Sequence, residues 1–178
     1  MSFTFLVGGA KSGKSNLALR HAADYQEKKK CPVYFIATAP ATDEEMSEKI
    51  RRHRRERRAD FITVEEQTDL LAAVKGIADG FVIVDCITLW IFNLLESGCD
   101  GDSLQAAVKG FAIEMAKKSI EGTVVSNEVG AGIVPADPYS RRYRDELGMA
   151  NQILAKHADK TYFTLAGKLL LLSDGDTL

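Results

Sequence analysis

The sequence predicts one α/β domain in which a largely parallel β-sheet is flanked by helices. The first observation is the alternation of short β-rich runs with longer segments of helical periodicity, joined by short connections. The second is the length of 178 residues, which suits one compact domain with a core of its own. The third is the composition, because 46% apolar and 27% charged residues are usual for a soluble globular chain. We therefore treat residues 1–178 as a single domain.

The N-terminal part begins with a strand, a glycine-rich turn and a helix. Phe3–Val7 is an apolar run of strand length, and Lys14–Gln26 carries apolar residues at roughly helical spacing. A β-rich run over Val33–Ile36 follows and ends in a loop over residues 37–42. Thr42 stands three residues before Glu45, which is a capping-box spacing, so we expect a helix from Thr42 through Arg58.

The middle of the chain contains the most apolar strand of the sequence. A brief strand over Phe61–Val64 and a helix over Leu70–Ile77 lead to the run Phe81–Asp85. An unbroken apolar run of this length is typical of a central strand in a parallel sheet, covered on both faces. Helical patterns follow over Leu89–Leu95 and Leu104–Ile120, with the glycine and aspartate residues of segment 98–102 expected to separate them.

The C-terminal part adds a strand, a long helix and a pair of strands. Thr123–Ser126 follows Gly122 as a short β-rich run. Asp137 before Pro138 predicts an N-cap with proline at the first helical position, and the apolar face of this helix extends to Ala158. The chain closes with β-rich runs over Thr161–Leu165 and Leu169–Leu172, which can form an antiparallel pair.

Residues 8–15 read GGAKSGKS and match the phosphate-loop pattern GxxxxGK[ST] between the first strand and the first helix. Glycines let backbone N–H groups turn toward phosphate oxygens, Lys14 reaches the β- and γ-phosphates, and the Ser15 hydroxyl can bind Mg²⁺. Asp85 ends an apolar strand, the usual place for a second Mg²⁺ ligand. The sequence therefore predicts a P-loop nucleoside triphosphatase fold with a RecA-like core, and Ser15 and Asp85 as the metal ligands.

A phosphate loop leaves the use of the nucleotide open. A GTPase switch of the Ras kind would normally carry the motif NKxD, which does not occur here. A RecA-like motor would need a face for nucleic acid, and the segment KIRRHRRERR over Lys49–Arg58 contains six arginines. The same arginines also suit the C-terminal end of a solvated helix whose first turns are acidic. The net charge of −2 gives no global attraction to nucleic acid.

The three histidines differ in their pattern. His53 follows Met46 by seven residues and Ile50 by three, so it shares their helix face and should point toward the body of the protein. Such a histidine is either a packed, hydrogen-bonded core residue or a catalytic one. His21 and His157 lie within other predicted helices and are interpreted as structural. Asn127 and Glu128 follow a strand that should end near the nucleotide, and Glu128 or Asp145 could orient a substrate hydroxyl.

Four sequence blocks together resemble the bifunctional adenosylcobinamide kinase and adenosylcobinamide-phosphate guanylyltransferase family. They are GGAKSGKS from Gly8, DEEMSEKIRRHR from Asp43, VDCITLWIFNLL from Val84 and VSNEVGAGIVP from Val125. The resemblance implies phosphorylation of the aminopropanol hydroxyl of adenosylcobinamide with ATP or GTP. It then implies transfer of GMP from GTP to that phosphate through a guanylyl-histidine, with Mg²⁺ as cofactor.

The resemblance also implies a set of site residues. His53 would be the guanylylated histidine, and Lys14 would act in catalysis from the phosphate loop. The implied nucleotide contacts are Gly8, Gly9, Ala10, Lys11, Ser12, Gly13, Lys14, Ser15, Ala37, Thr38, Ala39, Arg54, Arg55, Glu56, Arg57, Glu65 and Asp85. With the arginines bound to nucleotide, the basic segment no longer requires nucleic acid as a partner.

The expected setting is a soluble cytoplasmic enzyme that acts on adenosylcobinamide and its phosphate, without nucleic acid. The first residues lack the pattern of an export signal, and no apolar run approaches the ~20 residues of a membrane-spanning helix. Cys31, Cys86 and Cys99 suggest neither a disulfide framework nor a zinc site. The family resemblance implies a homo-oligomer, a trimer. Two alternatives stay open, a monofunctional P-loop small-molecule kinase and a RecA-like regulatory ATPase.

Overall fold

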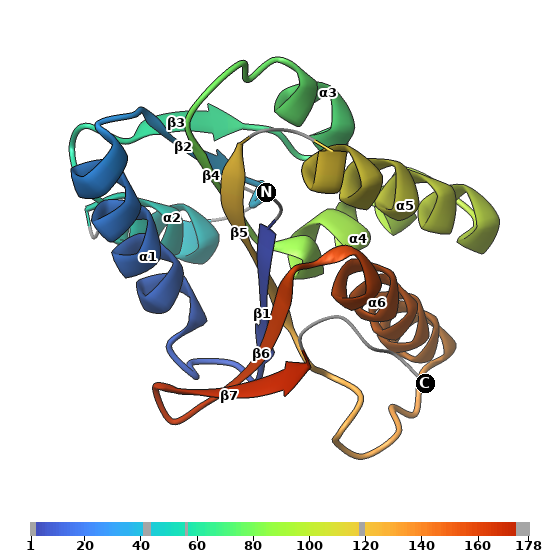
Figure 1. Cartoon of the computed structure of the whole chain (residues 1–178). Coiled ribbons are helices and arrows are strands. Elements are labelled where there is room, and N and C mark those ends of the chain that lie inside the picture. Colours follow the sequence, from blue (N-terminus) through green and yellow to red (C-terminus); the bar gives the residue numbers. More distant parts are fainter. Residues whose placement is uncertain (1–2, 41–43, 56, 118–119, 174–178) are drawn as a thin grey trace.

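The computed structural model describes residues 3–40, 44–55, 57–117 and 120–173, within which one sheet contains seven strands (Figure 1). The strand order across the sheet is β3-β2-β4-β5-β1-β6-β7. Neighbouring strands from β3 to β6 are parallel, and β7 is antiparallel to β6. The strands are β1 (Phe3–Gly8), β2 (Val33–Ala37), β3 (Ile62–Glu65), β4 (Phe81–Asp85), β5 (Glu121–Asn127), β6 (Lys160–Leu165) and β7 (Lys168–Ser173).

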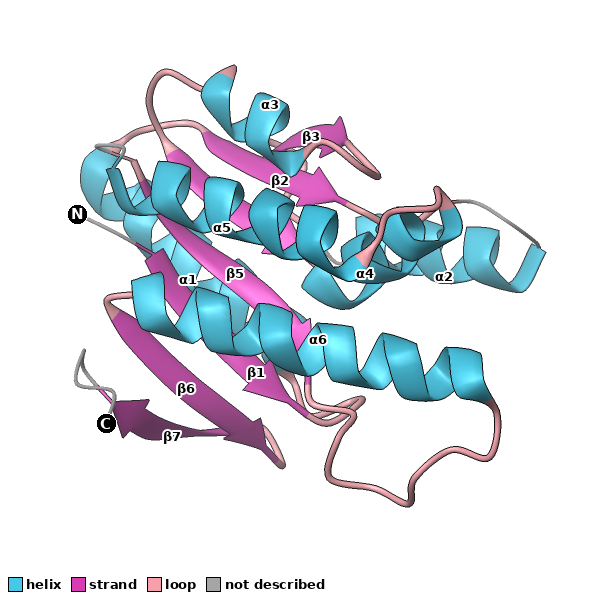
Figure 2. Ribbon diagram, turned by 90° about the vertical axis from the view of Figure 1, so that its right-hand side faces the viewer, coloured by secondary structure: helices cyan, strands magenta, loops and turns pink. Residues whose placement is uncertain are grey.

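Helices cover both faces of this sheet. Figure 1 and the rotated view in Figure 2 place α1 and α2 on one side and α3, α4, α5 and α6 on the other. The helices are α1 (Lys14–Lys29), α2 (Glu44–Arg55), α3 (Leu70–Lys75), α4 (Ile87–Glu96), α5 (Gly101–Lys117) and α6 (Pro138–His157). The prediction of a parallel sheet flanked by helices is confirmed.

The core consists of two apolar clusters, one on each face of the sheet. Successive side chains of a strand point to opposite faces, so Val82 and Val84 pack in the cluster that includes α3 to α6. Phe81 and Ile83 pack in the other cluster, against α1. Each of these four side chains is fully buried. The apolar run of β4 is continuous because helices cover this strand on both faces. Burial of each such side chain stabilises the folded state by about 1.5–3 kcal/mol.

Two helix boundaries differ from the prediction at the ends of α2 and α5. α2 ends at Arg55 instead of Arg58, because Arg57 returns to the sheet, where its guanidinium lies 3.5 Å from the centre of the Phe35 ring. α5 ends at Lys117 instead of Ile120, which is buried just before β5 begins. The predicted capping box at Thr42 lies outside the described residues.

The start of α5 also differs from the prediction. Gly101 and Asp102, expected to separate two helices, form the first turn of α5 instead. Asp100 is responsible, because its carboxylate accepts a hydrogen bond of 2.8 Å from the Ser103 N–H at the helix start. Because Asp100 caps the helix, α5 begins within the segment that was expected to be a loop.

Strand register brings the carboxyl ends of four parallel strands together. Asp85 at the end of β4 pairs with Ala37 of β2 on one side and with Val125 of β5 on the other. Gly8 at the end of β1 pairs with Asn127 at the end of β5. Open α/β sheets bind ligands beyond the carboxyl ends of their strands, so a ligand site is expected at this edge of the sheet.

Candidate active site

The turn between β1 and α1 has the backbone shape of a phosphate-binding loop. Lys11 and Gly13 adopt left-handed conformations, with φ of 54° and 98°. Gly13 also lies against the turn between β6 and β7, where a Cβ atom on it would come within 3.3 Å of Gly167 Cα. The left-handed backbone conformation therefore favours glycine at position 13, and a Cβ atom there would also crowd Gly167. The N-terminus of α1 follows at Lys14, which suits phosphate binding.

The strand pair β6–β7 holds this loop in place from its outer side. The Gly167 N–H donates a 2.9 Å hydrogen bond to the Ser12 carbonyl oxygen. At the start of the loop, a Cβ atom on Gly8 would come within 2.3 Å of the Thr164 carbonyl oxygen. Any larger residue at position 8 would thus push β1 away from β6.

Lys14 is the central cation of the loop and is almost fully buried, with 6% of its surface exposed. Its ammonium donates hydrogen bonds to the carbonyl oxygens of Gly8 (2.9 Å) and Gly9 (2.7 Å) and to Ser12 Oγ (3.2 Å). Burial lowers the pKa of Lys14, while the Asp85 carboxylate opposes that shift. The partners are neutral oxygens, so a phosphate would give this cation a charged partner.

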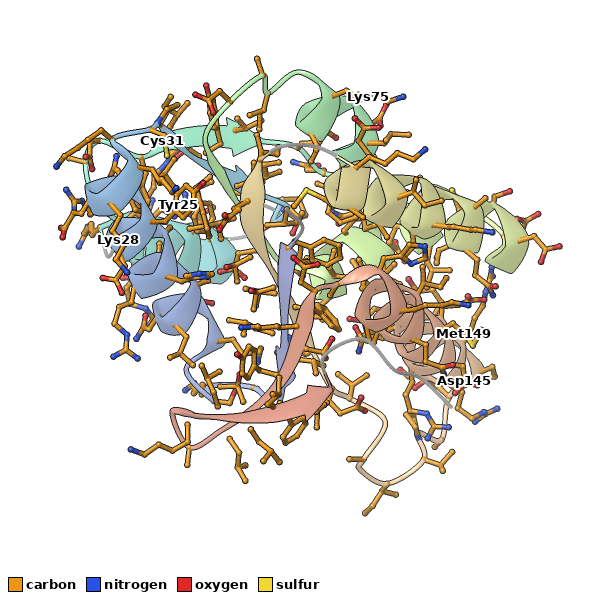
Figure 3. All side chains as sticks on the ribbon, viewed as in Figure 1. Tyr25, Lys28, Cys31, Lys75, Asp145 and Met149 are labelled. Atoms are coloured by element: carbon orange, nitrogen blue, oxygen red, sulfur yellow. The ribbon has the colours of Figure 1, made fainter. Side chains whose placement is uncertain are left out.

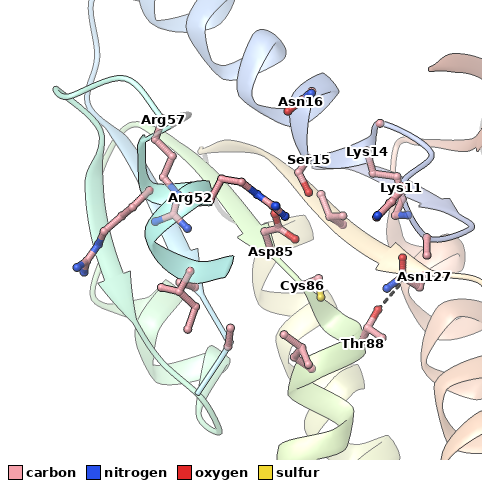
Figure 4. A pocket seen from close by; sticks show the side chains of 18 of the residues that line it. Lys11, Lys14, Ser15, Asn16, Arg52, Arg57, Asp85, Cys86, Thr88 and Asn127 are labelled. Carbon is pink, nitrogen blue, oxygen red and sulfur yellow. Dashed lines mark hydrogen bonds between the residues drawn. The ribbon is translucent and has the colours of Figure 1, made fainter. Parts of the chain in front are cut away.

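A cavity of about 640 Å³ opens between the loop, α2 and the carboxyl ends of β2, β4 and β5 (Figure 4). Its wall combines cationic, carboxylate, amide and aliphatic side chains. The residues around it are Ala10, Lys11, Ser12, Gly13, Lys14, Ser15, Asn16, Ala37, Ala39, Ile50, Arg52, Arg54, Arg57, Glu65, Gln67, Asp85, Cys86, Thr88, Leu89, Val125 and Asn127. Size and lining suit a phosphorylated small molecule.

Ser15 and Asp85 both border this cavity, from the start of α1 and the end of β4 (Figure 4). A hydroxyl and a carboxylate are hard oxygen ligands of the kind that Mg²⁺ prefers. Among the described residues, no group of three histidine, cysteine, aspartate or glutamate side chains could hold a metal alone. Mg²⁺ typically takes one or two protein ligands and completes its shell with phosphate and water, so these two residues fit it.

Arginines from α2 and from the turn after it form the opposite wall. Arg57 stacks on Phe35 and donates a 3.4 Å hydrogen bond to Thr63 Oγ1, while burial lowers its pKa. Arg54 forms a 2.5 Å ion pair with Glu65 of β3, so two predicted nucleotide contacts bind each other. Both partners are more than half exposed, so the pair adds little stability but places α2 over the cavity.

Thr38 has a structural position behind the cavity wall. It is fully buried, and its hydroxyl donates to the Cys86 carbonyl oxygen and accepts from the Cys86 N–H, both at 2.8 Å. Asn93 Nδ2 donates to the Thr38 carbonyl oxygen at 2.9 Å. The hydroxyl of Thr38 is thus engaged in joining β2 to the start of α4, and Thr38 is not among the residues around the cavity. Its neighbours Ala37 and Ala39 do border the cavity.

The remaining predicted site residues differ in position. Gly8 and Gly9 reach the site through the carbonyl oxygens that hold Lys14. Arg55 is exposed and is not among the residues around the cavity. The backbone of His53 lies in α2, between the cavity residues Arg52 and Arg54, while its side chain lies outside the described part of the structure. Glu56 lies outside the described residues altogether.

Several residues around the cavity were missed by the sequence interpretation. Arg52 belongs to the basic segment, but nothing in its spacing separates it from its neighbours. Gln67 and Thr88 follow β3 and β4, at positions that the rule of strand carboxyl ends could have indicated. The same rule had placed Asn127 near the nucleotide, and Asn127 at the end of β5 does border the cavity. Glu128, considered for orienting a hydroxyl, accepts a 2.5 Å hydrogen bond from the Gly130 N–H. Asp145 is exposed on the outer side of α6 (Figure 3).

This fold and this loop together define a P-loop protein of the RecA-like class. A similar arrangement occurs in the crystal structure of the flagellar accessory protein FlaH from Methanocaldococcus jannaschii, with a TM-score of 0.50 and 19% identity. The match covers 98% of this chain and 79% of that one, and it shows likeness of fold alone.

The chain belongs to the cobinamide kinase / cobinamide phosphate guanyltransferase family, whose sequence model matches residues 4–172. The bifunctional adenosylcobalamin biosynthesis protein CobP of Pseudomonas aeruginosa is 40% identical over 91% of this chain and 92% of its own length. The proteins named CobU of Escherichia coli and Salmonella typhimurium are 31% and 32% identical, each over 91% of this chain and 94% of their own.

Proposed function

We propose that this protein phosphorylates adenosylcobinamide and then transfers GMP from GTP to the resulting phosphate, giving adenosylcobinamide-GDP. The observation that supports the proposal is one cavity with two kinds of wall. One wall is a phosphate loop with a buried lysine, and the other is the basic face of α2, the helix that contains His53. This arrangement supports the proposal that both reactions use the same cavity.

In the kinase step, we propose that the loop binds the β- and γ-phosphates of ATP or GTP. The hydroxyl oxygen of the substrate attacks the γ-phosphorus, and the bond from that phosphorus to the bridging oxygen breaks. Lys14 stabilises the negative charge that develops on the departing nucleoside diphosphate. Ser15 and Asp85 would hold Mg²⁺, which when bound neutralises phosphate charge. That either ATP or GTP serves as the phosphate donor is part of this proposal.

In the guanylyl step, we propose that a neutral His53 imidazole attacks the α-phosphorus of GTP. A phosphorus–nitrogen bond forms and pyrophosphate leaves, after which the phosphate of the substrate displaces the histidine. Only the neutral imidazole has the free nitrogen lone pair that this attack requires. Arg52, Arg54 and Arg57 border the cavity near α2 and supply donors for phosphate or ribose oxygens.

We further propose that the protein is cytoplasmic, acts without nucleic acid and forms a homo-oligomer, a trimer as the family resemblance implies. Within the described residues, no helix combines the length and apolar character needed to cross a bilayer. The four consecutive leucines of β7, Leu169–Leu172, are each at least 45% exposed and lie on a sheet edge, which supports self-association. Sedimentation velocity measures the mass, and a stable monomer at micromolar concentration would refute the trimer.

Product analysis tests the proposed function directly. The protein is incubated with adenosylcobinamide, GTP and Mg²⁺, and the corrinoids are separated and identified by mass spectrometry. We expect phosphate and GDP derivatives from the wild type, and the phosphate alone from a His53→Ala variant. Only the phosphate from the wild type would indicate a monofunctional kinase. Unchanged adenosylcobinamide, with nucleotide still hydrolysed, would indicate a regulatory ATPase.

A further inference from the structure

Asn127 lies beside the phosphate loop at the end of β5. It pairs in register with Gly8, the last residue of β1. The Gly8 carbonyl oxygen accepts two hydrogen bonds, one from the Glu128 N–H at 3.0 Å and one from Lys14 Nζ at 2.9 Å. The peptide group that follows Asn127 and the ammonium of Lys14 therefore meet at a single oxygen atom. Figure 4 shows Asn127 at this end of the cavity, close to Lys11 and Lys14.

Two side chains from different helices fix the backbone of Asn127. Its N–H donates to Thr88 Oγ1 of α4 at 2.8 Å, drawn as a dashed line in Figure 4, and its carbonyl oxygen accepts from Asn151 Nδ2 of α6 at 3.1 Å. Asn151 Oδ1 in turn accepts from Ser126 Oγ at 2.6 Å, and the Tyr143 hydroxyl donates to the Thr88 carbonyl oxygen at 3.1 Å. A satisfied buried network of this kind sets a rigid geometry.

The network leaves the carboxamide of Asn127 available to a ligand. Ser126, Asn151 and Thr88 are 0%, 8% and 9% exposed, so the polar groups of the network lie in the interior. The Asn127 side chain instead borders the cavity, and it makes no hydrogen bond to another described residue. A carboxamide offers two N–H donors and an acceptor oxygen, which suits a phosphate oxygen or a hydroxyl. The surrounding structure thus holds the Asn127 carboxamide next to the Lys14 ammonium and leaves it available for a ligand.

We propose that Asn127 is a catalytic residue of the phosphoryl-transfer step, donating a hydrogen bond from Nδ2 to an oxygen of the γ-phosphate. This inference rests on the proposed kinase function. In that step the substrate oxygen bonds to the γ-phosphorus, the bridging oxygen leaves with the nucleoside diphosphate and its electron pair, and the hydroxyl proton passes to water. A fixed donor aimed at the transferred group stabilises charge in the transition state without having to reorganise.

The same position predicts a difference between the two reactions. Figure 4 shows α2 and Asn127 at opposite ends of the cavity. Guanylyl transfer to His53 breaks the bond at the α-phosphorus, on the α2 side, and the γ-phosphate then leaves within pyrophosphate. A donor to the γ-phosphate is therefore needed when that group is transferred and matters much less when the α-phosphorus reacts.

The test compares both reactions in Asn127→Ala, Asn127→Asp and the wild type. Gln152→Ala serves as the control, because Gln152 is an exposed amide on α6 outside the cavity. Kinase kcat and KM are measured with adenosylcobinamide, and guanylylation is measured as the rate at which α-labelled GTP labels the protein. We expect kinase kcat to fall about 10²–10³-fold in both Asn127 variants, with unchanged labelling at saturating GTP. The KM for nucleotide should change little in Asn127→Ala and rise in Asn127→Asp, because the new carboxylate repels phosphate.

The outcomes separate this inference from the proposed function. Kinase kcat in Asn127→Ala within threefold of the wild type, or an equal fall in kinase and labelling rates, would overturn the role of Asn127 alone. A wild type without kinase activity would overturn the proposed function and this inference with it. Thermal unfolding shows whether Asn127→Ala folds. If it does not, the comparison of kinase kcat and labelling rate is made with Asn127→Asp, which keeps the size of the side chain.

Discussion

At the residue scale, Lys14 links the fold to the chemistry most directly. Its ammonium is held by oxygens of Gly8, Gly9 and Ser12, all within the loop that its own helix follows. Burial disfavours its charged form, as the lowered pKa shows, and a bound triphosphate would favour that form again. Lys14 is thus placed so that nucleotide binding compensates for the desolvation of its charge.

Replacing Lys14 with alanine should therefore remove both activities. We expect kcat/KM for the kinase step to fall by at least about 10²-fold, because a charge contact to the transferred phosphate is lost. The control is Lys28→Ala, since Lys28 is exposed on α1 away from the cavity (Figure 3). Steady-state kinetics check the prediction, and a Lys14→Ala enzyme with wild-type kcat/KM would show that the loop does not bind the reacting phosphates.

At the element scale, the β6–β7 pair acts as a support for the phosphate loop. The Gly167 N–H holds the Ser12 carbonyl oxygen, so the Ser12–Gly13 peptide group has a defined orientation. The N–H of Gly13 points away from that carbonyl oxygen, because the two groups of a trans peptide are antiparallel. The β6–β7 pair thereby helps to orient the Gly13 N–H toward the place where a phosphate would bind.

Gly13→Ala tests this support, with Gly98→Ala as the matched control. Both glycines have left-handed φ values, 98° and 88°, so both variants carry the strain of about 1–2 kcal/mol that a Cβ atom brings there. A Cβ atom on Gly98 meets nothing within 4 Å, whereas one on Gly13 meets Gly167. We expect denaturant unfolding to show the larger loss for Gly13→Ala, and nucleotide affinity to fall only in that variant. Equal effects would argue against the support.

The turn before α3 gives a second prediction at this scale, on pH. Glu66 Oε1 accepts hydrogen bonds of 2.8 Å from the N–H groups of Asp69 and Thr68, which lowers the pKa of Glu66. A carboxylate whose pKa is lower in the folded than in the unfolded protein stabilises the folded state. For Glu66 this contribution is complete above the unfolded pKa of about 4.5 and is lost as the pH falls through the folded pKa.

The free energy of unfolding should therefore be about 1 kcal/mol lower in Glu66→Gln than in the wild type at pH 7. The difference should shrink as the pH falls from about 4.5 through the lower folded pKa of Glu66, because below that folded pKa both side chains are neutral. Urea titrations at several pH values measure it. A difference that stays constant down to pH 3 would mean that the charge of Glu66 does not contribute.

At the scale of the whole molecule, the sequence predicted the order of elements better than their arrangement. Alternating periodicities were sufficient for the parallel sheet and its C-terminal antiparallel pair, since each reports a local pattern. Strand order was not predictable in this way, because it depends on which strands meet after long crossovers. All described strands join one sheet, which supports the proposal that residues 1–178 form a single domain.

For the site too, residues of a contiguous motif could be predicted, whereas contacts between residues far apart in the chain could not. The loop motif over residues 8–15 is contiguous, so its residues could be named from the sequence. The hydroxyl of Thr38, an expected nucleotide contact, bonds to Cys86, which lies 48 positions away in the chain. Asn127 depends on Thr88 and Asn151, which come from two other helices. Contacts of this kind exist only once the strands are assembled.

The central claim is that one cavity serves both reactions and that His53 carries the guanylyl group. The most direct test incubates the protein with Mg²⁺ and GTP labelled with ³²P at its α-phosphate, and follows label on denatured protein. The comparison includes His53→Ala and the control His157→Ala, since His157 lies on α6 and bonds the Ile153 carbonyl oxygen. We predict acid-labile, alkali-stable label in the wild type and in His157→Ala, and none in His53→Ala. Label that persists in His53→Ala, or none on a folded wild type with kinase activity, would contradict the account.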